Sequence, residues 1–290
     1  MFVSFVVKFF RLLSFPLVRG KNFSTFFIFG KASCTAAPYI YMNVFTNLFL
    51  QAKEFLFPGA CALCGCSLIE AEEIRFSLCL NCSDGLTEAL RRSDLDSKCN
   101  LCGKPMISEI ETCLSCRNGE ARFFERLWVL FPYIGNFRKL LTAYKFGKNL
   151  ALADFFAEKI TGLLKDSVCK EIPDLKNAVI VPVPPRPGKI KDTGWDQVER
   201  LVNRLEKIPG IPIVVRCLKR RKSKVQKKLD RQERLENLKG RIYLNKAYTP
   251  QPVYILIDDV ITTGSTLEVC SAALKSAGAQ KVYCICLFYD

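Results

Sequence analysis

Four Cys-x-x-Cys pairs lie within residues 61–116, and they limit what this part of the chain can fold into more than any other feature. A two-residue spacer lets both thiolates of a pair bind one tetrahedral ion, and two pairs close a structural zinc site. Glycine follows two of the pairs, as a tight cysteine turn favours. We therefore expect one or two structural zinc ions, with these ligands: Cys61, Cys64, Cys79, Cys82, Cys99, Cys102, Cys113 and Cys116.

The order of the pairs favours two sequential zinc ribbons. The first would use the pairs at 61/64 and 79/82, and the second those at 99/102 and 113/116. Residues 65–78 and 103–112 would each form a short hairpin. A cross-braced arrangement of first with third and second with fourth pair stays open. Cys66 is more simply a bystander than a substitute ligand.

Two other chemistries could use cysteine pairs, but both fit less well. A disulfide scaffold needs an oxidising compartment, whereas the rest of the chain resembles a cytosolic enzyme. Thioredoxin-like redox chemistry accounts for one pair and not for four. Acidic residues outnumber basic ones between Cys61 and Cys116, so we expect this module to brace a neighbouring domain rather than to bind phosphates.

The formal net charge is +15, and most of it is concentrated in one segment. Residues 216–241 carry twelve basic residues against three acids. A polyanionic partner would therefore meet one basic segment rather than a uniformly basic protein. The chain has no histidine, which excludes mechanisms that need an imidazole base and leaves metal binding to cysteine and carboxylate.

The first 41 residues do not resemble the start of a folded domain. Lys8, Arg11 and Arg19 interrupt their apolar runs, so no stretch approaches the roughly 20 apolar residues that a stable membrane span needs. A secretory signal peptide is an alternative, although the charge is scattered rather than placed before one apolar run. We expect that translation begins at Met42 or that residues 1–41 are disordered. Mass spectrometry of the natural N-terminus tests this.

From about residue 123 the sequence predicts alternating strands and helices. The predicted strands span 125–135, 177–187, 211–218, 253–258 and 281–289. The predicted helices span 137–164, with a break near Gly147, and then 196–208 and 265–278. Near-continuous apolar strands between helices predict an α/β domain with a mostly parallel sheet. The expected organisation is an extension over 1–41, a double zinc ribbon over 42–122 and this domain over 123–290.

Two adjacent carboxylates, Asp258 and Asp259, end the predicted strand at 253–258. A segment rich in hydroxyls follows and enters the next predicted helix: Thr262, Thr263, Gly264, Ser265 and Thr266. Backbone N–H groups at a helix N-terminus bind anions such as phosphate, and ligands lie beyond the carboxyl ends of parallel strands. An ordinary helix cap would need only one such residue. The pattern predicts a phosphorylated sugar, with acids on the ribose hydroxyls and the loop on the 5′-phosphate.

Residues 257–266 resemble the phosphoribosyl diphosphate (PRPP) loop of type I phosphoribosyltransferases. Further motifs narrow the resemblance to ComF-family competence proteins over roughly residues 50–290. They are Tyr144-Lys145-Phe146-Gly147, Val181-Pro182-Val183-Pro184, Gly194-Trp195-Asp196-Gln197, and the spaced set Arg220, Lys222, Gln226, Leu229, Arg234 and Asn237. The resemblance implies a phosphoribosyltransferase fold behind a zinc ribbon and PRPP binding with Mg²⁺. It also implies a cytoplasmic role with single-stranded DNA and competence proteins during natural transformation.

Carried onto this chain, the resemblance makes Asp258 and Asp259 the ribose ligands and residues 262–266 the 5′-phosphate cradle. It places four residues against the diphosphate: Val183, Pro184, Pro185 and Arg186. The basic segment would be a mobile loop whose cations stabilise the leaving diphosphate. The residues implied there are Arg220, Arg221, Lys222, Lys224 and Gln226.

One segment departs from the family pattern, which usually has R-G-F-N-Q where this chain has T-G-W-D-Q at 193–197. Losing the arginine and gaining Asp196 weakens the local anion site, although Lys189 and Lys191 are close enough in sequence to substitute. Two alternative functions are therefore expected. One is a PRPP-dependent phosphoribosyl transfer whose acceptor stays open. The other is a non-catalytic protein that keeps the PRPP pocket and binds nucleic acid or partners.

Overall fold

The computed structural model describes residues 59–92, 98–104, 106, 111–117, 122–221, 240–245 and 247–290. They all belong to one unit of the chain, Lys53–Asp290. In this described part, no helix is both long and apolar enough to cross a membrane. The expectations for residues 1–41 and for Met42 lie outside the described residues.

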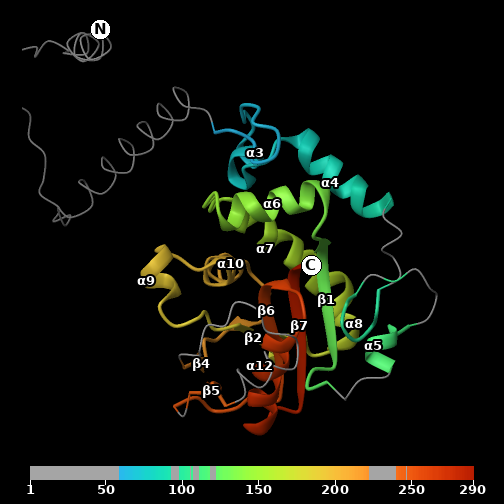
Figure 1. Cartoon of the computed structure of the whole chain (residues 1–290), viewed down its shortest axis with the longest axis vertical. Coiled ribbons are helices and arrows are strands. Elements are labelled where there is room, and N and C mark those ends of the chain that lie inside the picture. Colours follow the sequence, from blue (N-terminus) through green and yellow to red (C-terminus); the bar gives the residue numbers. More distant parts are fainter. Residues whose placement is uncertain are drawn as a thin grey trace, which may run out of the picture. The chain divides into compact units, whose positions relative to one another are not determined.

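Five parallel strands form the central sheet (Figure 1). In spatial order they are β1 (Arg126–Pro132), β7 (Lys281–Tyr289), β6 (Val253–Ile261), β2 (Val179–Pro182) and β3 (Ile213–Val214). Most residues of β6 and β7 are buried, because a parallel sheet has elements packed on both faces. The predicted α/β class with a mostly parallel sheet is confirmed.

Three helices cover one face of this sheet. They are α6 (Gly135–Lys145), α7 (Leu152–Leu163) and α10 (Gln197–Leu205). Alternate strand residues point to this face, among them Ile255, Ile257 and Ile285, and they share a core with the apolar sides of the helices. The break predicted near Gly147 separates α6 from α7.

The opposite face is covered by α12 (Ser265–Ser276) and by an antiparallel pair, β4 (Leu218–Arg220) and β5 (Ile242–Leu244). Tyr254, Leu256 and Cys284 point to this side. Shorter elements connect the larger ones. They are a π-helical turn (Leu164–Val168), α8 (Cys169–Glu171), a 3₁₀ turn (Leu175–Asn177) and α9 (Lys189–Thr193).

The described residues of the cysteine-rich region include the helices α3 (Ala71–Phe76), α4 (Leu80–Arg92) and α5 (Leu114–Arg117). Phe76 of α3 packs edge-on against Phe155 of α7, with 6.0 Å between ring centroids. Farther along, the Leu127 N–H of β1 donates to the Leu101 carbonyl at 3.1 Å. Both parts of the region therefore contact the α/β domain directly.

Several boundaries differ from the sequence expectations, each for a physical reason. β6 continues to Ile261, because its backbone keeps pairing with β7 although two of its side chains are carboxylates. The single strand expected over 211–218 is two short strands, since β3 pairs with β2 and β4 pairs with β5. Helix α3 (Ala71–Phe76) lies within the segment expected as a hairpin between Cys64 and Cys79.

Candidate functional site

The two adjacent acids lie where β2 stops and β6 continues. Pro182 is the last residue of β2 and pairs with Ile257, so β6 has no partner on that side at Asp258 and Asp259. The chain after β2 stays close, because the Val183 N–H donates to the Ile257 carbonyl at 2.9 Å. The acids and the start of the Val183–Arg186 loop are therefore brought together at the carboxyl edge of the sheet, where ligands of such folds bind.

The two carboxylates differ in the groups that they contact. Asp259 forms an ion pair with Lys145 of α6, with 3.2 Å between Nζ and Oδ2. Asp258 accepts a hydrogen bond from the Asp259 N–H at 2.8 Å. Burial raises the pKa of Asp258 well above its ordinary value, and the negative charge of Asp259 raises it further. Asp259 is thus paired with a cation, whereas the charged form of Asp258 is destabilised by its surroundings.

The loop after β6 has the form of an anion cradle. Gly264 has φ +78°, a left-handed conformation that favours glycine, and it is the N-cap of α12. The Thr263 and Ser265 hydroxyls lie 2.9 Å apart and hydrogen-bond to each other. Thr262 is exposed and Thr266 is half-buried. Loop hydroxyls and the N-terminal N–H groups of a twelve-residue helix can therefore reach the same anion.

Arg220 lies near Asp258, on the side of the sheet that carries α12, and Arg186 lies near Arg220. The pKa of Arg220 is lowered by burial and by the nearby charge of Arg186, while Cys270 and Asp258 oppose this shift. The Nε atom of Arg220 is buried and has no hydrogen-bond partner among the described residues. A partly buried guanidinium with an unused donor is suited to bind an anion. Arg186 itself is exposed in the loop after β2.

The remaining residues predicted for the diphosphate and the basic loop are described only in part. Val183 and Pro184 are buried and Pro185 is half-buried. Arg221 is exposed, and its guanidinium lies 4.8 Å from the centroid of the Tyr243 ring. The predicted loop residues Lys222, Lys224 and Gln226 lie outside the described residues.

The segment that departs from the family pattern has a structural role in this chain. Asp196 is buried, and its carboxylate caps α10 by accepting the Glu199 N–H at 3.0 Å. Lys189 neutralises it, with 2.5 Å between Nζ and the second carboxylate oxygen. Two lysines were expected to replace the missing arginine. Lys189 is already paired with Asp196, whereas Lys191 is exposed.

Lys145 belongs to the Tyr-Lys-Phe-Gly motif, but the sequence alone assigns it no role in the site. The structure brings it to Asp259, which is far away in the sequence. Its neighbour Tyr144 is fully buried and donates a hydrogen bond from its hydroxyl to the Gln197 carbonyl at 2.7 Å. The signal available in the sequence was a cation within the Tyr-Lys-Phe-Gly motif, but no local pattern connects that cation with an acid on another element.

The second cysteine cluster consists of the four predicted thiols. The sulfurs of Cys99, Cys102, Cys113 and Cys116 all lie within 4.8 Å of one another. Burial raises the pKa of Cys99, but hydrogen bonds from the Cys102, Cys113 and Leu101 N–H groups lower it more strongly, to about 6. Four converging thiols with a stabilised thiolate fit a tetrahedral zinc ion.

The first cluster contains one thiol more than a tetrahedral site needs. The sulfurs of Cys61, Cys64, Cys66 and Cys79 lie within 4.8 Å of one another. The Cys82 thiol in the first turn of α4 also contacts Cys61, Cys64 and Cys79. Both clusters join neighbouring pairs of the sequence, as the sequential arrangement predicts. Cys66, expected as a bystander, is brought into the first cluster.

Because five thiols surround four coordination positions, we predict that Cys66 and Cys82 can replace each other. Cys66→Ser and Cys82→Ser should each keep the zinc content of the wild type, whereas the double variant should lose one equivalent. Cys61→Ser is the matched control and should lose that equivalent alone. The measurement is zinc per chain by atomic emission on gel-filtered protein. Loss of zinc from either single variant would identify one fixed fourth ligand instead.

Comparison with known proteins finds three distantly similar competence proteins. No protein-family model matches the chain. Competence protein F of Haemophilus influenzae is 28% identical over 188 residues, which cover 63% of this chain and 81% of that protein. Competence protein ComFC of Bacillus subtilis is 26% identical over 186 residues, or 62% and 72% of the two chains. ComFC of Streptococcus pneumoniae is 25% identical over 197 residues, or 66% and 83%. Over about 63% of its length, this chain is a distant homologue of the ComF and ComFC competence proteins.

Proposed function

We propose that this protein binds PRPP together with Mg²⁺ at the carboxyl edge of its sheet. The observation that carries the proposal is the acid pair Asp258 and Asp259, followed directly by the left-handed Gly264 at the N-terminus of α12. Phosphate groups favour such helix N-termini, whereas carboxylates repel phosphate and accept hydrogen bonds from hydroxyls. A ligand with both parts, a ribose and a 5′-phosphate, satisfies both halves of the site.

The same placement gives the diphosphate of PRPP an electropositive surrounding. Arg220, the last residue of β4, lies near Asp258, and Arg186 in the loop after β2 lies near Arg220. Fixed cations stabilise a leaving diphosphate most strongly when its charge develops, as the bond to C1 of the ribose breaks. Mg²⁺, when bound with the diphosphate, adds charge neutralisation there. We therefore propose transfer of the phosphoribosyl group to an acceptor as the reaction.

Catalytic turnover is proposed to be slow although PRPP binds, because Thr193 stands where the family pattern has an arginine and the nearby Lys189 is already paired with Asp196. The experiment that tests the function is calorimetric titration of PRPP with Mg²⁺, followed by an assay of diphosphate release. Binding with release supports the transferase. Binding without release supports a PRPP-binding protein, and absence of binding contradicts the site. By likeness to the named competence proteins, we place this function in DNA uptake.

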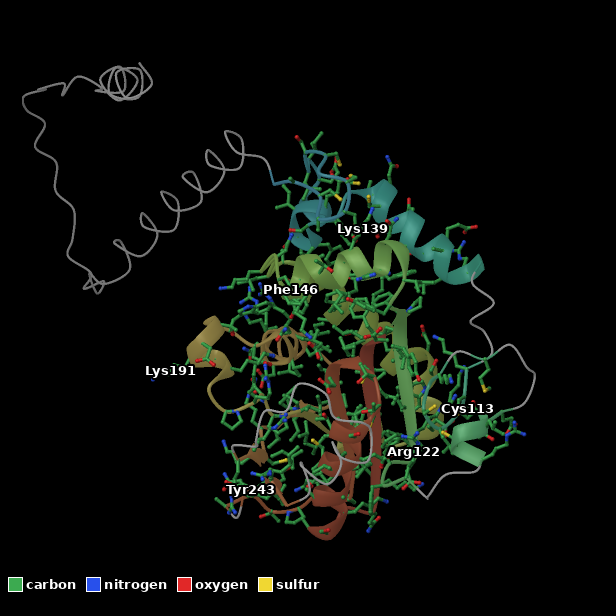
Figure 2. All side chains as sticks on the ribbon, in the orientation of Figure 1. Cys113, Arg122, Lys139, Phe146, Lys191 and Tyr243 are labelled. Atoms are coloured by element: carbon green, nitrogen blue, oxygen red, sulfur yellow. The ribbon has the colours of Figure 1, made fainter. Side chains whose placement is uncertain are left out.

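A second candidate function, binding of single-stranded DNA, is favoured by the surface at the end of α6. Phe146 is 72% exposed, although large apolar side chains are usually buried. Lys148 donates to the Thr193 carbonyl at 3.0 Å, so this segment lies beside α9 and its exposed Lys191 (Figure 2). An exposed ring among cations is the usual platform on which single-stranded bases stack.

We predict that Phe146→Ala weakens binding of a single-stranded oligonucleotide by roughly 5- to 150-fold, since stacking of one base on an aromatic ring contributes about 1–3 kcal/mol. The dependence of affinity on salt should stay unchanged, because no phosphate contact is removed. Phe123→Ala, at an exposed ring beside α12, is the control. Fluorescence anisotropy at several salt concentrations measures both quantities. Equal affinity of wild type and Phe146→Ala would contradict this assignment of the surface.

A further inference from the structure

The short segment between the second cysteine cluster and β1 runs along α12. Arg122 lies at the start of this segment and pairs with Glu268 in the first turn of the helix. Glu125 lies near its end and pairs with Lys275 in the last turn, with 2.8 Å between Oε1 and Nζ. Residues 122–125 therefore connect the cluster with the helix whose N-terminus forms the anion cradle.

Glu268 is buried, and both of its carboxylate oxygens have donors from this segment. One oxygen accepts from Arg122 Nη1 at 2.9 Å, and the other accepts from the Phe123 N–H at 3.2 Å. The Glu268 N–H in turn donates to the Gly264 carbonyl at 3.0 Å. A side chain at position 264 would place its Cβ only 3.4 Å from Arg122 Nη1. The guanidinium thus lies directly behind the glycine of the cradle.

The other side of Arg122 meets the second cysteine cluster. Arg122 hydrogen-bonds to the Cys116 thiol, and its charge also acts on Cys102. Figure 2 labels Arg122 together with Cys113, a further member of the cluster. A zinc ion with four thiolates carries a net negative charge, and a buried cation beside it compensates that charge and orients its ligands. Arg122 is therefore shared between the cluster and the cradle.

We propose that Arg122 is a positioning residue that couples metal binding at the second cluster to the shape of the anion cradle around Gly264. With metal bound, the fixed Cys116 thiolate holds the guanidinium in place, and the guanidinium holds Glu268 in the first turn of α12. Without metal, this support of the cradle is lost. By linkage, an anion in the cradle must stabilise the metal to the same extent. This coupling concerns the same site as the proposed PRPP function, and the binding experiment described next rests on that function.

The affinity arm compares the wild type with the double variant Arg122→Met/Glu268→Gln. Removing both charges leaves no unpaired buried charge, and the introduced amide keeps an oxygen for the Phe123 N–H. Selective loss of metal from the second cluster, made with Cys102→Ser, should weaken PRPP binding of the otherwise wild-type chain at least about fivefold. In the double variant, binding should already be weak, and adding Cys102→Ser should change it less than about twofold. Equal losses in both backgrounds would overturn the proposal.

A second arm needs no PRPP, so the two proposals can fail separately. Protein loaded with ¹¹³Cd should give one NMR resonance for each cluster, and the resonance missing from Cys102→Ser belongs to the second. Gly264→Ala should move that resonance in the wild-type background and leave it in place in Arg122→Met/Glu268→Gln. The resonance of the first cluster is the internal control. If Gly264→Ala does not move the resonance of the second cluster, the coupling is overturned. If the resonance moves but the protein does not bind PRPP, only the PRPP function is overturned.

Discussion

Replacing Asp258 with asparagine is expected to weaken PRPP binding by roughly 10- to 150-fold, because hydrogen bonds to a charged group contribute about 1.5–3 kcal/mol. Asparagine keeps the oxygen that accepts the Asp259 N–H at 2.8 Å, so the backbone geometry should be preserved. What it removes is the charge that ribose hydroxyls would meet. Calorimetric titration with PRPP and Mg²⁺ measures the effect.

The same substitution should stabilise the folded protein at neutral pH. Burial and the charge of Asp259 raise the pKa of Asp258 in the folded state. The folded protein therefore holds this proton more tightly than the unfolded chain does, so its stabilisation is complete below the ordinary pKa and is lost as pH rises through the raised pKa. Asp258→Asn avoids this loss, and we expect about 1 kcal/mol, or roughly 2–4 °C in Tm, at pH 7.5.

Asp259→Asn is the matched control for stability, because Asp259 forms an ion pair with Lys145 at 3.2 Å. This variant should lose PRPP affinity without any gain in Tm. Thermal unfolding from pH 4 to pH 8 separates the two variants. The advantage of Asp258→Asn over the wild type should grow with pH. A lower Tm of Asp258→Asn at neutral pH would show that the charged form of Asp258 is stabilised in the fold.

Loss of metal from the second cysteine cluster should unfold residues 98–117 while the sheet persists. The described core of this module consists of Cys99, Cys102 and Cys113, with three partly buried neighbours. Such a small buried apolar surface does not stabilise a folded module by itself. In small zinc modules, binding of structural zinc contributes on the order of 10 kcal/mol to the free energy of folding. Cys102→Ser should therefore lose one zinc equivalent and become sensitive to proteolysis in this segment. Limited proteolysis with mass spectrometry locates the cuts.

The first cluster should respond less to loss of its metal. Its cysteines Cys61 and Cys79 share a core with Phe76 and Leu78, which pack against the helices of the α/β domain. Cys61→Ser should thus lose one zinc equivalent with little new cleavage. Cys169→Ser is the control for both clusters, since its thiol lies outside them and donates to the Lys165 carbonyl as a serine hydroxyl also can. Equal cleavage of Cys102→Ser and wild type would contradict a structural role of the second metal.

The parts of the fold that local patterns control were predictable. The apolar runs of β6 and β7 are long enough to identify buried parallel strands, and the two acids before a threonine-rich loop place the site at the end of β6. The end of β6 was less predictable. Asp258 and Asp259 break the apolar run, but backbone pairing with β7 continues to Ile261 regardless of side-chain polarity.

The contacts that complete the site join distant parts of the chain, and no single sequence shows them. Lys145 reaches Asp259, and Arg122 reaches Glu268 across 146 residues. The position of Cys66 had a local signal, since it follows the Cys61/Cys64 turn closely. Its contact with Cys79 nevertheless depends on α3, a helix that folds the segment between them.

The most direct test of the PRPP site is one calorimetric titration series on the zinc-loaded protein with PRPP and Mg²⁺. The wild type and Asp192→Asn, which changes an exposed acid of α9, should bind one PRPP per chain with the same affinity. Asp258→Asn/Asp259→Asn should show no saturable binding at the same concentrations. A wild type that does not bind PRPP, or a double variant that binds it as the wild type does, would contradict a PRPP site at these two acids.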